Sequence, residues 1–249
     1  MRPSALYSNT IITVKSSLLL SEDKIKRMIA GDNFDEAVLV LLECGYDQNV
    51  IVNAENDEDK IIADEMKKCI ALFTKLCPDG ALLDAVNTQF DYHNARILYK
   101  ARFDGLNVHD AIYPSETAHF HKLEHAINKK QYTFLPQNMR TALKTLDGID
   151  APTADKIDEV FNKALLAEMQ GIAKKIKSAF VRQYLLTDDP AVLQSDNLVP
   201  KGDDSAFGLE KFLKWFILKK RELAIVKTIL MGKKLGLTRD KIREMVAGI

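Results

Sequence analysis

Apolar residues recur every three to four positions along most of the chain, which is the spacing of amphipathic helices. Residues suited to N-capping stand before three of these stretches: Ser21, then Asn56 or Asp57, and Thr153. The pattern predicts two short helices separated at Gly31 and Asp32, followed by longer helical segments. The longer segments are 57–76, 81–103, 153–186 and 209–230. The hydrophobic pattern therefore indicates an all-α protein.

Two short segments, 11–14 and 50–53, are rich in β-branched residues. Each is isolated and lacks a second segment with which to form a sheet, so we interpret them as a helix edge and a loop. Residues 187–207 combine Asp, Asn, Pro and Gly and are typical of an extended loop. No sheet is expected.

A twelve-residue motif occurs twice, at 20–31 and 237–248, with mostly conservative differences. In both copies the second residue is a Ser or Thr suited to N-capping, and an Ile and Met core face follows. A looser third copy falls at 97–112. Duplication of this kind is more typical of a scaffold than of a protein built around one catalytic cleft.

Charge and cysteine content narrow the function classes. The 249 residues include 35 basic and 35 acidic side chains, so no net field attracts nucleic acid or an anionic bilayer. The three cysteines, Cys44, Cys69 and Cys77, lie in apolar or helical contexts typical of reduced thiols in a cytoplasmic protein. The longest aliphatic run, 37–42, is far shorter than a membrane span, and no signal-peptide core is apparent at the start.

Motifs for catalysis are almost absent from the sequence. It contains no phosphate-binding glycine loop and no nucleophile elbow, so we expect no bound cofactor and no catalytic residue. His121, Glu124 and His125 fit the His-x-x-Glu-His pattern of inverted zinc proteases, but no segment offers a distinctive third ligand. We therefore expect no metal, and keep a zinc-dependent hydrolase only as an alternative.

The C-terminal segment is basic within a neutral chain: residues 212–249 hold ten Lys or Arg and three Asp or Glu. One interpretation is a surface that faces an acidic partner, and the alternative is a solvated helix face. The candidate partner-facing residues are Lys219, Lys220, Arg221, Lys233 and Lys234.

Four segments together resemble one known family. Residues 7–46, the Asp91-x-x-Asn94 motif with Leu98 and Gly105, residues 153–184 and residues 207–249 are similar to the C subunits of V-type and A-type ATP synthases. The equivalent protein of eukaryotic vacuolar ATPases is named the d subunit. The resemblance extends over nearly the whole chain.

This resemblance implies an all-α, funnel-like assembly of three related helical bundles over residues 1–249, with sub-bundles at 1–105, 106–200 and 201–249. It also implies a non-catalytic central-stalk subunit, peripheral on the cytoplasmic side, that caps the membrane rotor ring and holds the central shaft. Contact with the membrane would be made only through the complex. The chain is shorter than is usual in the family, and residues 187–202 stand where the family has a further helix. We therefore expect one of the three bundles to be smaller than in the family.

Three motif residues receive structural roles. We expect Asp91 and Asn94 to satisfy backbone groups at a helix start, and Glu222, flanked by Lys220 and Arg221, to act in an ion pair rather than as an acid or base. A helical scaffold or adaptor unrelated to rotary ATPases remains the main alternative function.

Overall fold

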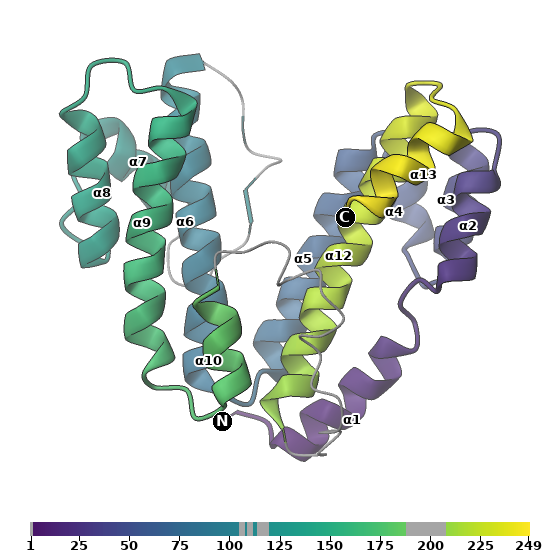
Figure 1. Cartoon of the computed structure of the whole chain (residues 1–249), viewed down its shortest axis with the longest axis horizontal. Helices are drawn as coiled ribbons and strands as arrows, with labels where there is room; N and C mark the ends of the chain where they lie inside the picture. The colour runs from purple at the N-terminus through teal and green to yellow at the C-terminus, as the bar shows by residue number, and fades with distance from the viewer. Residues whose placement is uncertain (1, 105–107, 109–111, 114–119, 188–207) are drawn as a thin grey trace. The chain divides into compact units, whose positions relative to one another are not determined.

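The computed structural model describes residues 2–104, 108, 112–113, 120–187 and 208–249 (Figure 1). These residues form α-helices and connections without a strand, which confirms the all-α prediction. The chain divides into two compact units. Unit 1 combines Met1–Pro78 with Asp189–Ile249, and unit 2 is Asp79–Asp188. The division into three sub-bundles stays a prediction.

Unit 1 is built around one long central helix, α12. Its helices are α1 (Ala5–Ser16), α2 (Glu22–Ala30), α3 (Phe34–Leu42), α4 (Gln48–Asn53), α5 (Glu58–Leu76), α12 (Leu209–Lys234) and α13 (Arg239–Ala247). Helix α12 lies along α5 and also packs against α1, α3 and α13 (Figure 1). The ring of Phe73 on α5 lies 4.8 Å from that of Phe212 and 4.5 Å from that of Phe216, centroid to centroid. Trp215 is also buried, so this aromatic group forms core packing as its spacing predicts.

Unit 2 has its own hydrophobic core. Its helices are α6 (Gly80–Asp104), α7 (Phe120–Lys129), α8 (Gln137–Asp147), α9 (Ala154–Ala173) and α10 (Ala179–Leu185). Helices α6 and α9 lie side by side, and α7 and α8 pack against them (Figure 1). Tyr92, Tyr99, Leu123, Leu143 and Phe161 lie at the centre of this core and are almost fully buried.

The two copies of the repeat are α2 and α13, each nine residues long. The Ser21 and Thr238 hydroxyl oxygens accept hydrogen bonds from the backbone N–H of Lys24 and Lys241, at 3.4 and 3.3 Å. The two helices contact each other within unit 1. The third copy, 97–112, falls largely outside the described residues.

Two element predictions need correction. The single helix expected over 153–186 is wrong, since α9 ends at Ala173 and α10 begins at Ala179. Ser178 caps α10 by accepting from the Val181 N–H at 3.2 Å. The segment 50–53, expected to be a loop, lies in α4, where Asp47 provides the N-cap. The loop expected at 187–207 lies almost entirely outside the described residues.

A helix that crosses a membrane must be both long and apolar. Among the helices that the structure describes, none combines enough length with enough hydropathy to do so.

Candidate functional site

A buried ion cluster centred on Glu222 joins four segments of unit 1. Glu222, on α12, is only 5% exposed. Its Oε1 accepts hydrogen bonds from the Tyr46 hydroxyl at 2.8 Å and from Lys219 Nζ at 2.6 Å. Its Oε2 accepts from the backbone N–H of Leu20 at 2.7 Å. The Lys219 ammonium also lies 2.9 Å from Glu65 Oε1 on α5. The cluster therefore ties α12 to α5, to the segment after α1 and to the segment after α3.

The ion-pair partner of Glu222 is Lys219, one helical turn earlier, rather than the adjacent Lys220 or Arg221. Burial lowers the pKa of Lys219, but Glu222 and Glu65 outweigh burial, so this pKa is raised overall. Burial and the negative charge of Glu222 both raise the pKa of Tyr46. The lysine is thus charged and the phenol protonated at neutral pH, a state suited to holding segments together rather than to proton transfer.

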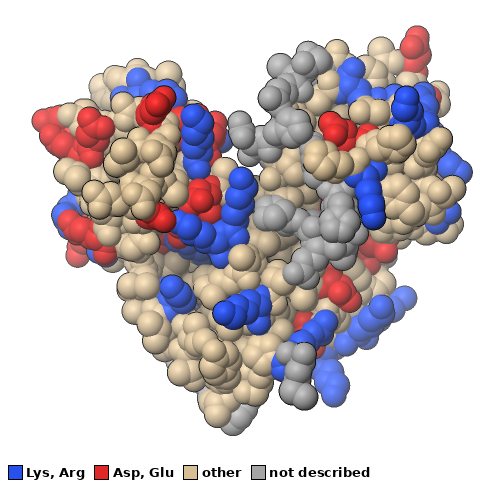
Figure 2. All heavy atoms as spheres, turned by 180° about the vertical axis from the view of Figure 1, so that it is seen from behind, with Lys and Arg blue, Asp and Glu red and all other residues tan. Residues whose placement is uncertain are grey.

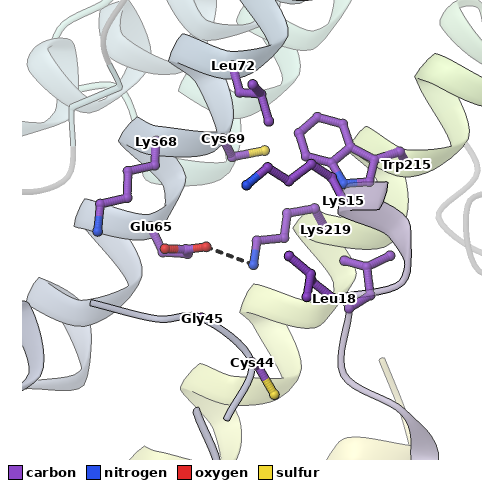
Figure 3. Close-up of a pocket in the computed structure, with 11 residues that line it drawn as sticks. Lys15, Leu18, Cys44, Gly45, Glu65, Lys68, Cys69, Leu72, Trp215 and Lys219 are labelled. Carbon is purple, nitrogen blue, oxygen red and sulfur yellow. Dashed lines mark ion pairs between the residues drawn. The ribbon is translucent and has the colours of Figure 1, made fainter. Parts of the chain in front are cut away.

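A pocket of about 270 Å³ opens beside this cluster (Figure 3). Its lining includes Lys15, Leu18, Cys69, Trp215 and Lys219. Cys44 also lines it, 3.3 Å from Lys24 Nζ. Burial raises the pKa of both thiols, that of Cys69 to about 12, so these cysteines are protonated at neutral pH. Neither is an activated nucleophile.

The Asp91 and Asn94 motif lies in the interior of α6, so the prediction that these residues stand at a helix start is wrong. Asn94 is 1% exposed, and its side chain forms a paired contact with the backbone of Tyr113. Nδ2 donates to the Tyr113 carbonyl oxygen at 2.8 Å, and Oδ1 accepts from the Tyr113 N–H at 2.9 Å. Asp91 is also buried. Asn94 therefore satisfies backbone groups nineteen residues away rather than those of its own helix end.

A second carboxylate-centred cluster, which the sequence analysis missed, lies in unit 2 around Asp147. This residue accepts hydrogen bonds from the Tyr132 hydroxyl at 2.6 Å and from the Tyr99 hydroxyl at 3.3 Å. Arg102 and Lys130 lie 3.3 and 3.6 Å away. Burial acts to raise the pKa of Asp147, but the hydrogen bonds from Tyr132 and Arg102 outweigh it and lower this pKa. No sequence motif marks the cluster, because its members come from separate segments.

The histidine pair of the zinc alternative lies on α7. His121 has a side chain that is 86% exposed, with Nδ1 3.8 Å from a Glu124 carboxylate oxygen, and His125 is exposed as well. Within the described part of the chain, no group of three His, Cys, Asp or Glu side chains is arranged to hold a metal ion. A catalytic zinc site requires three protein ligands.

The five candidate partner-facing basic residues are largely engaged inside unit 1. Lys219 belongs to the Glu222 cluster, and Lys233 Nζ donates to the carbonyl oxygens of Ile29, at 2.6 Å, and of Gly31. Lys234 Nζ lies 2.9 Å from Glu58. Lys220 and Arg221 are partly buried, and burial lowers the pKa of Lys220. On the face shown in Figure 2, basic and acidic side chains are interspersed. A partner-facing role for these five residues stays a prediction.

Comparison with known proteins identifies the family. The model of the family described as ATP synthase (C/AC39) subunit matches residues 8–188. The chain is also 20% identical over 175 residues to the C subunit of the V-type sodium ATPase of Enterococcus hirae, an alignment that covers 68% of this chain and 52% of that protein. It thus spans about half the length of this curated relative. The resemblance noted in the sequence is confirmed, and the chain belongs to the ATP synthase (C/AC39) subunit family, whose members are structural rather than catalytic subunits of the ATPase complex.

Proposed function

We propose that this protein is a central-stalk subunit of a V/A-type ATPase that caps the membrane rotor ring and couples rotation to ATP hydrolysis or synthesis and ion transport. The observation that carries the proposal is the family match over residues 8–188, together with the similarity to the C subunit of a V-type sodium ATPase. The partners would be the rotor ring and the central shaft. The chain would lie peripherally on the cytoplasmic side and contact the membrane only through the complex.

The packing of unit 1 supports this proposal physically. A protein that transmits torque needs helices that do not slide past one another, and close-packed interiors transmit strain. Helix α12 packs against α1, α3, α5 and α13 of its unit. The Glu222 cluster adds directional hydrogen bonds between segments as far apart as Leu20 and Glu222. Stiffness of this kind requires no reactive residue.

The test of the proposal is to tag the chain in its native host, solubilise the membranes gently and identify the proteins that copurify. We expect the proteins of the rotor ring and of the catalytic head, and an untagged strain provides the control. In membranes that lack the chain, ATP hydrolysis by the head should persist while ATP-driven ion transport is lost. Recovery without any part of the ATPase, from a host whose ATPase assembles without the chain, would favour a helical scaffold of another kind.

A further inference from the structure

A lysine and a cysteine meet where α2 lies beside the end of α3. Lys24 Nζ donates to Cys44 Sγ at 3.3 Å. The same sulfur donates to the Val40 carbonyl oxygen at 3.3 Å, and Cys44 is only 6% exposed. The thiol is therefore held in one place, with an amine nitrogen next to it.

A neighbouring ion pair keeps this contact in register. Arg27, one helical turn after Lys24 on α2, donates through Nη1 and Nη2 to the two carboxylate oxygens of Glu43, each at 2.7 Å. Glu43 directly precedes Cys44 in the chain. A two-point contact of arginine with a carboxylate fixes orientation as well as distance. Because residues three apart lie on the same side of a helix, the Arg27 pair keeps the Lys24 amine beside the thiol.

A small oxidant has a path to this pair. Cys44 and Gly45 both line the pocket of about 270 Å³ beside the Glu222 cluster. A Cβ added at Gly45 would meet no atom within 4 Å, so open space borders the chain next to Cys44. Hydrogen peroxide is small and uncharged, and it can therefore reach the thiol without unfolding of unit 1.

We propose that Lys24 and Cys44 are a modification site, at which hydrogen peroxide creates a covalent crosslink with one oxygen atom between Nζ and Sγ. In the first step, peroxide oxidises the thiol to a sulfenic acid and is reduced to water. Lys24 then releases a proton to solvent, and the sulfenic oxygen bonds to the uncharged amine nitrogen. A second peroxide accepts the two electrons and two hydrogens that this bond displaces, and leaves as two waters. One thiol, one amine and two peroxides thus give the S–O–NH bridge and three waters.

The crosslink would restrain unit 1 under oxidising conditions. It closes a loop between residues 24 and 44, which limits the freedom of the unfolded chain. Its Cys44 end lies two residues before Tyr46, whose hydroxyl donates to Glu222. A protonated thiol reacts slowly with peroxide, so the bridge responds to sustained exposure rather than to a brief one. Thiol reductants would reverse it, since they attack the sulfur of the bridge.

The test treats the purified full chain with hydrogen peroxide, digests it and analyses the peptides by mass spectrometry. We expect the Lys24 and Cys44 peptides to be joined, with a mass about 14 Da above their sum, because one oxygen is added and two hydrogens are lost. Dithiothreitol should separate them. Lys24→Arg should abolish the joined species, whereas the matched control Lys26→Arg, on the exposed side of α2, should retain it. The oxidised chain should also have a higher thermal midpoint than oxidised Lys24→Arg.

Several results would overturn the inference. Conversion of Cys44 to a sulfinic or sulfonic acid with Lys24 unmodified would show that the amine does not trap the oxidised sulfur. A disulfide to Cys69 would show that the thiol has a different partner, and a joined mass below the sum of the two peptides would exclude the bridging oxygen. The test uses the isolated chain, so each of these results leaves the proposed role in the ATPase unaffected.

Discussion

At the scale of single residues, two carboxylates are each surrounded by donors: Glu222, which is buried, and Asp147, which is partly buried. Glu222 accepts from Tyr46, Lys219 and the Leu20 backbone, and Asp147 accepts from Tyr132 and Tyr99. A buried ion pair does not by itself stabilise a fold, because desolvation offsets the attraction, but removal of one partner leaves a buried charge unbalanced. Substitution of one member of either cluster should therefore lower the stability of its unit.

We expect Glu222→Gln to lower the free energy of unfolding by about 3 kcal/mol, because Lys219 then keeps only Glu65 as a counter-charge. Urea unfolding followed by circular dichroism measures this change. Glu244→Gln is the matched control, since Glu244 pairs with Lys241 on the exposed surface of α13, and its urea midpoint should equal that of the unaltered protein. A Glu222→Gln midpoint as high as that of the control would show that the cluster does not hold unit 1 together.

The Asp147 cluster predicts a pH dependence. The pKa of Asp147 is lowered in the folded state, so its carboxylate stabilises the fold above the unfolded-state pKa of about 4. That stabilisation disappears as the pH falls through the lowered pKa. Asp147→Asn has no such titration, so the difference in stability between the unaltered chain and this variant should be largest near pH 7 and shrink below about pH 4. Thermal unfolding at several pH values tests this, and a constant difference would contradict it.

At the scale of elements, the helix contacts depend on side-chain size at a few positions. A Cβ added at Gly232 on α12 would stand 2.7 Å from Ile242 Cγ1 of α13, whereas one added at Gly171 on α9 would meet no atom within 4 Å. We expect Gly171→Ala to raise the free energy of unfolding by up to about 1 kcal/mol through helix propensity. Gly232→Ala should lower it by about 1 to 2 kcal/mol, because the fully buried Ile242 side chain must move. Chemical unfolding of both variants measures these changes. A higher free energy of unfolding for both variants would mean that α13 is loosely packed.

Local sequence signals predicted much of the helical structure. Ser21, Asp57 and Thr153 each accept hydrogen bonds from the first turn of their helix, as capping residues do. The break before α10 was not predicted, because apolar spacing continues across it while Ser178 caps a new helix. The burial of Ser8 and Asn9 on α1 also escaped prediction, since their side chains donate to carbonyl groups 68 and 199 residues away. Contacts of that range leave no local pattern.

The candidate site was predicted only in part, for the same reason. Glu222 was identified as an ion-pair residue, but Tyr46 and Glu65 come from other segments, so the cluster follows from the fold. Asn94 was identified from its motif, yet its partner is the backbone of Tyr113. The residue types were visible in the sequence, while their partners were set by tertiary packing.

At the scale of the whole molecule, the two units differ in how the chain builds them. Unit 2 is one continuous segment, Asp79–Asp188, with its own core. We expect a fragment of residues 79–188 to be helical and to unfold cooperatively on heating, as an independent domain does. A fragment of residues 2–78 is the control and should not fold, since it lacks α12, the central helix of unit 1. A non-cooperative transition of fragment 79–188 would show that unit 2 depends on the rest of the chain.

The construction of unit 1 from both chain ends has a consequence for biosynthesis. Helix α5 ends at Leu76 and α12 begins at Leu209, so the ribosome adds 132 residues between them. At typical elongation rates this takes on the order of ten seconds, and unit 2 can fold during this time. The apolar faces of α1, α3 and α5 stay uncovered until α12 has been synthesised. The nascent chain thus completes its middle before its beginning, and its N-terminal helices meanwhile expose apolar surface of the kind that chaperones bind.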